Sequence, residues 1–251
     1  MGVIRYDGAD WCRFQTLASP LANTSNGAHT CAILLKRAIA DSNFRSFSYL
    51  LNGSVVTQAG ISVNTTGLAT ADYGAQSVAP TLDFPSLTET YIIIEGKSSG
   101  TVVPRFSRYV QSTNTWTHEN GGTSLVDGAV ATMLEIGSWA GGSDLMNGWI
   151  GLIGWWTGNM SDTNRELLDD NWSCSNWYNN PHGTPTALIP GNVEAASMID
   201  LIGNASNIAV TGTPTLDNAE TLANFNFDGT GSEPDNPLIQ PYILRSTQRW
   251  R

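Results

Sequence analysis

Charged residues are scarce in this 251-residue chain, and basic residues are the scarcer kind. Charged side chains make up 14% of the chain, with 22 acidic against 12 basic residues and a formal net charge of −10. Proteins that bind nucleic acid usually carry a basic patch that meets the phosphates, and anionic membrane surfaces attract basic segments. The charge balance therefore argues against nucleic-acid binding and against binding to anionic membrane surfaces.

Cysteine and long apolar runs are also rare. The three cysteines, Cys12, Cys31 and Cys174, are odd in number and show no C-x-x-C spacing, so neither a disulfide framework nor a zinc site is predicted. No segment approaches the ~18 apolar residues of a membrane-spanning helix. The first residues lack the basic-then-apolar order of a secretory signal. We expect buried free thiols and synthesis in a reducing cytoplasm without a signal peptide.

Sets of residues that catalyse hydrolysis are not recognisable. A glycosidase needs two carboxyls about 5–9.5 Å apart, which on one strand means acidic residues two or four positions apart. The strand-like segment around Glu135 offers only that carboxyl, and Glu89 and Glu95 lie six positions apart without a third acid. The three histidines are widely separated, and no Ser-His-Asp arrangement or phosphate-binding glycine loop can be read. The sequence predicts a protein that is not an enzyme and has no resident cofactor.

The chain consists instead of short strands separated by turns. The predicted strands cover residues 3–14, 29–37, 44–51, 54–63, 91–95, 101–110, 132–139 and 148–157. Glycine, asparagine and serine cluster in the gaps, and the alternation of strands with helices that typifies a parallel sheet is missing. This pattern predicts an antiparallel β-sandwich.

Residues 148–161 are the most informative segment. They form an apolar, aromatic strand that ends at a Thr-Gly-Asn turn and leads into a helix start. Ser161 or Thr163 can cap that helix, and residues 163–166 have the capping-box spacing. We expect the helix to reach about Trp172.

Four segments, in this order, resemble the laminin-G-like, concanavalin-A-like jelly roll. They are the Tyr-Asp-Gly-x-Asp run at 6–10, the strand at 30–36, the strand and helix start at 148–161, and an Asp-x-x-Gly-Asn element at 200–212. The resemblance covers residues 3–229 and rests on strand pattern alone between 37 and 130. It implies an all-β, antiparallel jelly-roll β-sandwich with one short helix after the last core strand. Domains of this kind without a signal peptide occur in tailed-bacteriophage virions, so the resemblance also implies a virion protein.

The resemblance leaves a calcium ion open as an alternative to no cofactor. Calcium binds hard oxygen ligands, which Asp7, Asp10, Asp144 and Asn147 supply, and Asp144 is the first candidate. For contact with a sugar we single out Trp139, Asp144 and Asn147, because aromatic faces stack on sugar rings. The alternative is that the tryptophans pack the core and that the acidic residues bond to their own turns.

One departure from the family pattern concerns Gly151 and Leu152, which stand where the family has acidic residues. Strict alternation would put Trp149, Gly151, Ile153 and Trp155 on one face of the strand, and both faces would then be apolar. A strand with a wet outer face should show polar residues there. We therefore expect the outer face to be covered by residues 173–229, by the C-terminal segment, or by a neighbouring subunit.

The C-terminal tail, defined as residues 230–251, differs from the rest of the chain. A turn-rich linker with two prolines precedes an apolar stretch, and three of the twelve basic residues lie in the last seven positions. We divide the chain into a jelly-roll domain at 1–229, with a peripheral strand-turn-strand extension at 173–229, and this tail. The residues predicted to bind a partner are Leu238, Ile239, Tyr242, Ile243, Leu244, Arg245, Arg249, Trp250 and Arg251.

These features together predict a non-enzymatic virion structural protein, either a capsid decoration protein or a minor tail component. It would dock on other virion proteins, or on copies of itself, through the tail and an apolar sandwich face, with weak adhesion to host glycans as a second role. The alternative is a carbohydrate-binding lectin module. A glycoside hydrolase is the third option, and it lacks the paired carboxylates.

Overall fold

The computed structural model describes residues 3–38, 45–53, 56–64, 67–73, 76–83, 89–139, 142–172, 174–192, 194–220 and 222, with the side chains of residues 56 and 170–172 excepted. Within these ranges the chain forms two antiparallel sheets. Sheet A consists, in spatial order, of β10 (Thr115–Asn120), β9 (Arg105–Val110), β8 (Thr90–Lys97), β3 (His29–Arg37), β12 (Asn147–Thr157), β1 (Val3–Asp7) and β15 (Thr215–Asp217), with β13 (Ala187–Pro190) also paired to β12. Sheet B consists of β14 (Ala205–Thr211), β2 (Trp11–Leu17), β11 (Met133–Ile136), β4 (Arg45–Asn52), β5 (Val56–Val63), β6 (Ala69–Tyr73) and β7 (Gln76–Val78).

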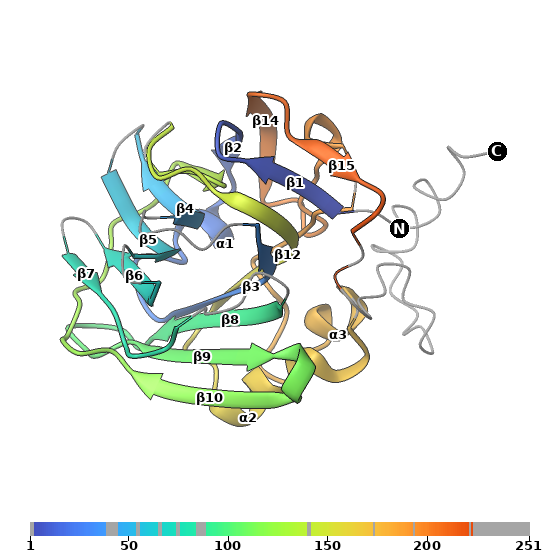
Figure 1. Cartoon of the computed structure of the whole chain (residues 1–251). Helices are drawn as coiled ribbons and strands as arrows, with labels where there is room; N and C mark the ends of the chain where they lie inside the picture. Colours follow the sequence, from blue (N-terminus) through green and yellow to red (C-terminus); the bar gives the residue numbers. More distant parts are fainter. Residues whose placement is uncertain are drawn as a thin grey trace.

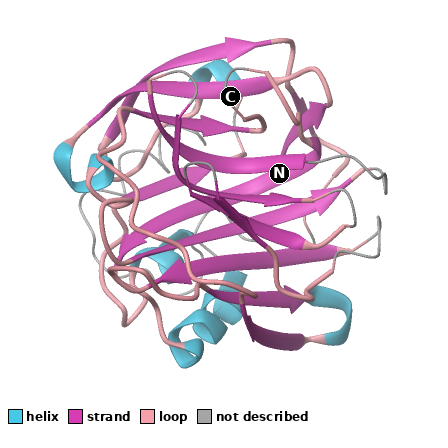
Figure 2. Ribbon diagram, turned by 90° about the vertical axis from the view of Figure 1, so that its left-hand side faces the viewer, coloured by secondary structure: helices cyan, strands magenta, loops and turns pink. Residues whose placement is uncertain are grey.

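The helices are short and peripheral to the strands (Figures 1 and 2). They are α1 (Ser19–Ala22), α2 (Asp162–Glu166), α3 (Cys174–Tyr178) and the 3₁₀ turns η1 (Gln111–Thr113), η2 (Leu167–Trp172) and η3 (Ala195–Ser197). The all-β jelly-roll sandwich predicted from the sequence is confirmed. No helix among the residues described is long and apolar enough to cross a membrane.

The segment at 3–14 was predicted as a strand with an Asp7-Gly8 turn signal inside it, and the turn is confirmed but divides the segment into β1 and β2. It forms two strands, because the chain turns at Gly8, which has a φ of +91°, and Asp7 Oδ1 accepts a hydrogen bond from the Ala9 N–H at 3.0 Å. β1 joins sheet A and β2 joins sheet B. The Asp-Gly signature is therefore the point where the chain crosses between the two layers.

Alternating side chains fill the space between the sheets. The inner cluster includes Ile33, Leu134 and Trp155, all fully buried. Trp156 follows Trp155 directly and lies in a second cluster on the outer face of sheet A. The two adjacent tryptophans point to opposite faces as expected, and both are core residues.

The outer face of sheet A is covered by the chain itself. Trp177 of α3, Leu168 of η2, and Leu222 bury themselves against Leu152 and Trp156 of β12. Residues of the 173–229 extension therefore cover part of this face, which was one of the three alternatives predicted. Residues of α2 and η2 cover a further part. The prediction that a partner docks on this apolar face is wrong, because residues of the same chain already occupy it.

A β-bulge changes which side chains of β12 share a face. The register with β3 shifts between Ile150 and Leu152, so that Gly151 is the extra residue. Ile150, Ile153 and Trp155 consequently point inward, while Trp149 packs on the outer cluster. The strict alternation used for the sequence prediction fails at this glycine.

The helix cap was predicted at Ser161 or Thr163, and the structure selects Ser161. The Asn164 N–H donates to Ser161 Oγ at 3.3 Å, so Ser161 is the N-cap of α2 and Thr163 is not. α2 ends at Glu166 and continues as η2 to Trp172, which is the end predicted for the whole helix.

The Asp-x-x-Gly-Asn element is a turn that leads into β14, organised around one carboxylate. Asp200 accepts hydrogen bonds of 2.8–3.1 Å from the backbone N–H groups of Leu188, Ile202, Asn204 and Ala205. Burial raises the pKa of the Asp200 carboxyl, and these four N–H groups oppose that effect. The signature thus encodes the connection from sheet A to sheet B.

Candidate functional site

The hairpin after β11 carries two of the three residues predicted to contact a ligand. Trp139 and Ser143 exchange two backbone hydrogen bonds of 2.8 and 2.9 Å. The Trp139 indole N–H donates to Thr57 Oγ1 at 2.6 Å, which fixes the ring against β5 while 36% of the residue stays exposed. The hairpin presents an oriented aromatic surface to solvent.

Asp144 closes the same hairpin. It is exposed and adopts a left-handed backbone conformation with a φ of 51°, and its carbonyl accepts the Ser46 N–H at 2.8 Å. Desolvation raises the pKa of the Asp144 carboxyl, Asp72 raises it further, and Arg45 opposes both. This carboxyl therefore lies within electrostatic reach of β4 and β6.

Asn147 does not join the other two residues. Its Oδ1 accepts a hydrogen bond from Arg5 Nη2 at 2.9 Å, and its Nδ2 faces the Asp7 carbonyl at 3.5 Å. The structure thus places Trp139 and Asp144 on one hairpin and turns the Asn147 amide toward β1. Its part in ligand binding stays a prediction, with β1 as a competitor for its hydrogen bonds.

Oxygen ligands at the rim are used to hold turns. Asp10 accepts the Thr213 N–H at 2.6 Å and the Asp7 N–H at 3.3 Å. Among the residues that the structure describes, no group of three or more His, Cys, Asp or Glu side chains is placed to hold a metal ion. Calcium binding by Asp144 stays a prediction.

A row of mostly polar residues crosses the outer face of sheet B. Registered pairs connect Ala209, Arg13, Glu135, Tyr49, Gly60, Asp72 and Ser77, one residue from each strand. Their neighbours along the strands belong to the inner core, so the row points away from it. Arg13 Nε donates to Glu135 Oε2 at 2.8 Å, and Ser138 Oγ donates to the other oxygen of this buried carboxylate.

Gly60 leaves room for the Tyr49 side chain to cross β5 and reach Asp72 on β6. A Cβ on Gly60 would stand 2.1 Å from the Tyr49 ring, so the ring lies across β5 at this position. The Tyr49 hydroxyl then donates to Asp72 on β6, which also accepts from Ser62 Oγ at 2.8 Å. Burial, and secondly Asp72, raise the pKa of the Tyr49 phenol well above its usual value, so it stays a donor.

The two carboxylates of this row do not meet the requirement for glycoside hydrolysis. Glu135 and Asp72 lie on β11 and β6, with β4 and β5 between them. Neighbouring strands are about 4.8 Å apart, which puts the two backbones roughly 14 Å apart, beyond the separation of an inverting pair. Each carboxylate is also occupied by donors from the chain.

Ser107, His118 and Glu166 form an arrangement that the sequence did not reveal. His118 Nδ1 lies 2.8 Å from Ser107 Oγ, and Nε2 lies 2.9 Å from Glu166 Oε1. A nucleophile must reach its substrate, but Ser107 is fully buried and its Oγ accepts a hydrogen bond from Arg165 Nη1 at 2.9 Å. This trio therefore attaches α2 to β9 and β10 and offers no accessible nucleophile.

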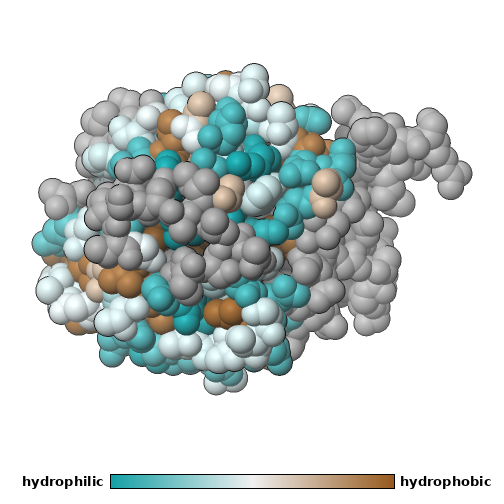
Figure 3. Space-filling view, viewed as in Figure 1, coloured by the Kyte–Doolittle hydropathy of each residue, from teal (hydrophilic) through white to brown (hydrophobic). Residues whose placement is uncertain are grey.

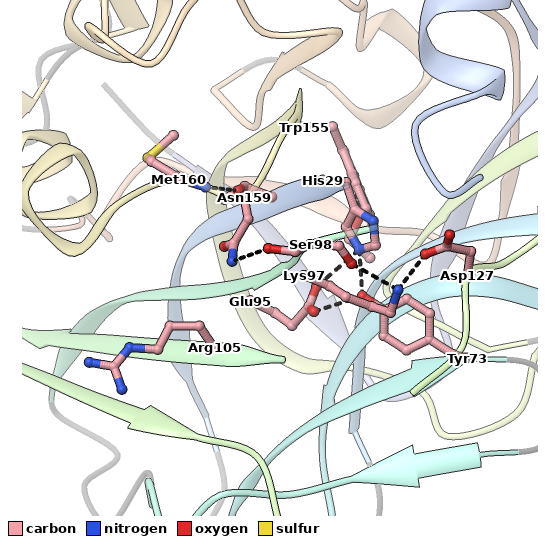
Figure 4. Close-up of polar contacts among 12 residues, drawn as sticks. His29, Tyr73, Glu95, Lys97, Ser98, Arg105, Asp127, Trp155, Asn159 and Met160 are labelled. Carbon is pink, nitrogen blue, oxygen red and sulfur yellow. Dashed lines mark hydrogen bonds and ion pairs between the residues drawn. The ribbon is translucent and has the colours of Figure 1, made fainter. Parts of the chain in front are cut away.

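A second polar cluster lies between the sheets at one end of the sandwich (Figure 4). His29, Tyr73, Glu95 and Lys97 are at most 2% exposed, and Lys97 Nζ is paired with Asp127. The sequence analysis treated the histidines as unrelated and missed this group. The available signal was Glu95 and Lys97, which are polar residues at alternate, core-facing positions of an otherwise apolar strand.

Other predicted residues lie outside the described part of the chain. The residues predicted to bind a partner, from Leu238 to Arg251, belong to the tail and are not described. On the face seen in Figure 3, hydrophobic residues of the described part form small separate patches. Within the described ranges, the exposed large hydrophobic residues are Val103, Val126, Val130, Trp139 and Ile199.

Comparisons with known proteins identify similar folds and no close relative. No protein-family model matches the chain, and no curated protein matches its sequence. Tailspike protein 2 of an Escherichia coli O157:H7 bacteriophage is similar in structure, with a TM-score of 0.50 and 15% identity over 75% of this chain and 26% of that one. The chain thus spans about a quarter of the length of that tailspike.

Two further solved structures are similar at lower scores. The carbohydrate-binding module CBM40 of the Ruminococcus gnavus IT-sialidase has a TM-score of 0.46 and 10% identity, over 67% of this chain and 96% of the module. The LG1-3 region of the laminin alpha2 chain has a TM-score of 0.43 and 13% identity, over 64% and 32%. At these identities the likeness concerns the fold alone. The two-sheet topology and the tailspike match together show the fold of this chain, which is an antiparallel jelly-roll β-sandwich.

Proposed function

We propose that this chain is a non-enzymatic module of a bacteriophage virion that docks through its C-terminal tail and presents the Trp139 hairpin outward. The observation that carries the proposal is the closure of sheet A by residues up to Leu222. Since the apolar face is already filled, docking falls to the apolar and arginine-rich tail. The tailspike, a phage protein with the same fold, supports the virion setting.

Removal of residues 232–251 is expected to abolish association with the virion while leaving the domain folded. The domain should keep its melting temperature, because the described apolar clusters draw on residues only up to Leu222. Co-sedimentation with particles assembled in the presence of the full-length or the truncated chain measures the association. Occupancy equal to that of the full-length chain would rule out the tail as the anchor.

A charge variant separates sequence-specific docking from general stickiness. Replacing Arg245, Arg249 and Arg251 together with lysine keeps the charge, whereas replacing them with alanine removes it. If paired arginine contacts hold the tail, both variants should lose occupancy, because lysine lacks the planar, two-pronged donor geometry. Retention by the lysine variant alone would indicate attraction by charge.

The second candidate function is carbohydrate binding, and the exposed, fixed ring of Trp139 favours it. An aromatic ring held by its own N–H needs little ordering when a sugar stacks on it. Trp139→Ala is expected to weaken binding to a recognised glycan by about tenfold, from the ~1–1.5 kcal/mol typical of an aromatic contact. A glycan array with the isolated domain measures this, and Trp116→Ala on the distant strand β10 is the matched control. A uniformly silent array, or equal loss in both variants, would count against this site.

A further inference from the structure

Three side chains form a polar contact between the two sheets, and we call them the cross-sheet clamp. His29 of β3 and Glu95 of β8 come from sheet A, while Tyr73 of β6 comes from sheet B. All three are buried, with exposed fractions of 0–2%. Figure 4 shows them converging beside Trp155 and Lys97.

The clamp contains three hydrogen bonds in series. His29 Nδ1 lies 3.1 Å from the Gly27 carbonyl oxygen. His29 Nε2 contacts the Tyr73 hydroxyl, and that hydroxyl lies 2.6 Å from Glu95 Oε1. Each of the three contacts needs one hydrogen atom between its two heavy atoms.

If Glu95 is ionised, a neutral His29 and a neutral Tyr73 supply only two hydrogens for the three contacts. A carbonyl only accepts, so a neutral imidazole that makes the Gly27 contact carries its hydrogen on Nδ1 and has none on Nε2. The phenol supplies a second hydrogen, which can serve either His29 or Glu95 but not both. The remaining contact would then bring two lone pairs together at hydrogen-bond distance, inside a protein where water cannot intervene.

One additional proton resolves the conflict, in either of two arrangements. An imidazolium can donate to Tyr73 while Tyr73 donates to the Glu95 carboxylate, or a protonated Glu95 can donate to Tyr73 while Tyr73 donates to a neutral imidazole. In both, the clamp carries no net charge, which suits its burial. Glu95 Oε2, which has no hydrogen-bond partner, faces His29 Nε2 at 3.4 Å and is stabilised by the first arrangement.

The surrounding groups do not replace this proton. Lys97 Nζ already donates to Asp127, to the Ser98 carbonyl at 3.0 Å and to the Gly100 carbonyl at 2.6 Å. Arg165 lies on the opposite face of β8, and its guanidinium nitrogens donate to Met160, Arg105, Ser107 and Asn159 and not to Glu95.

The uncharged neighbours do not supply a hydrogen either. The Cys31 thiol is buried beside Glu95, and its pKa is raised well above the usual value by burial and then by that carboxylate. The Trp155 N–H donates to Ser48 Oγ at 3.1 Å.

We propose that His29, Tyr73 and Glu95 together form a binding site for one extra proton, and that this proton closes the sandwich at this end. The inference is independent of what the module binds. The native state then holds one proton more than the unfolded chain from about pH 6.5, where an unfolded histidine loses its charge, up to the pH at which the native site releases its own proton. Because protons favour the state that binds more of them, the unfolding equilibrium constant rises with pH, by up to tenfold per pH unit.

Glu95→Gln provides the test, since its amide N–H supplies the third hydrogen covalently. Urea unfolding between pH 7 and 8 should show a steeper rise of the unfolding constant with pH for the native sequence than for Glu95→Gln, by up to tenfold per unit. Glu135→Gln is the control. It changes a fully buried glutamate on the outer face of sheet B, away from the clamp, and should keep the pH dependence of the native unfolding constant. Parallel profiles for the native chain and Glu95→Gln would overturn the proposal.

Buried thiols set the upper limit of this pH range. Burial raises the pKa of Cys12 to about 11, so unfolding at more alkaline pH also releases thiol protons.

A second measurement needs no variant. Calorimetric unfolding of the native chain at pH 7.5 in buffers of different ionisation enthalpy should report release of about one proton. Release of none would refute the site.

Discussion

Aspartate in place of Gly151 is expected to lower the free energy of unfolding by about 4 kcal/mol or more. A Cβ at this position would stand 2.4 Å from Leu222 Cδ1 and 3.0 Å from Leu34 Cδ2. The added carboxylate would also enter an apolar cluster in which Leu34 and Leu222 are at most 2% exposed. Steric crowding and the desolvation of an unpaired charge therefore act in the same direction. Urea denaturation followed by tryptophan fluorescence measures the loss.

A double-mutant cycle separates the two causes. Gly151→Ala introduces only the clash, and Leu222→Ala removes the nearest atom that it meets. The pair should cost clearly less than the sum of the two single changes, because the alanine methyl group then fills part of the space left by the leucine. Strict additivity, or native stability for Gly151→Asp, would show that Leu222 does not occupy this position in solution.

The same position explains how this jelly roll departs from the family pattern. Acidic residues at 151 and 152 suit a strand with a polar outer face, whereas Leu152 is fully buried here under α3, η2 and Leu222. The apolar character of both faces was sufficient to predict a covered strand. The β-bulge that fixes which residues face outward was not predictable, because a glycine fits a regular strand and a bulge equally well.

The fold was readable from the sequence because period-two hydrophobicity and turn residues act locally. β3, β4, β5 and β12 were predicted close to their observed limits. The strands missed altogether, such as β6, β7 and β10, are short or polar, and they are specified by pairing with neighbours distant in sequence.

The polar sites were less predictable than the fold, because they depend on contacts between residues that are distant in sequence. His29, Tyr73 and Glu95 are brought together by sheet registers and by the packing of one sheet on the other, and no short motif encodes these. The row from Arg13 to Asp72 likewise depends on the register of neighbouring strands. Trp139 was identified from its residue type, and its orientation depends on a bond to Thr57 that only the folded chain reveals.

The buried guanidinium of Arg165 connects α2 to sheet A. Its nitrogens donate to the Met160 carbonyl at 2.9 Å, the Arg105 carbonyl at 3.0 Å, Ser107 Oγ at 2.9 Å and Asn159 Oδ1 at 2.8 Å. Burial lowers the pKa of Arg165 to about 10, so the group remains charged at neutral pH. All four acceptors would lose a donor if the side chain were replaced.

Arg165→Met is therefore expected to lower the free energy of unfolding by about 3–5 kcal/mol, because it leaves several buried acceptors unsatisfied. Arg165→Lys should recover little, since one ammonium group cannot reproduce the four directed bonds. Arg105→Met is the matched control: it breaks a partly exposed ion pair with Asp162 and should cost about 1 kcal/mol or less. Urea unfolding of the three variants gives the comparison. Equal losses for Arg165→Met and Arg105→Met would mean that the buried hydrogen bonds add nothing, and that α2 is held to sheet A by its apolar contacts alone.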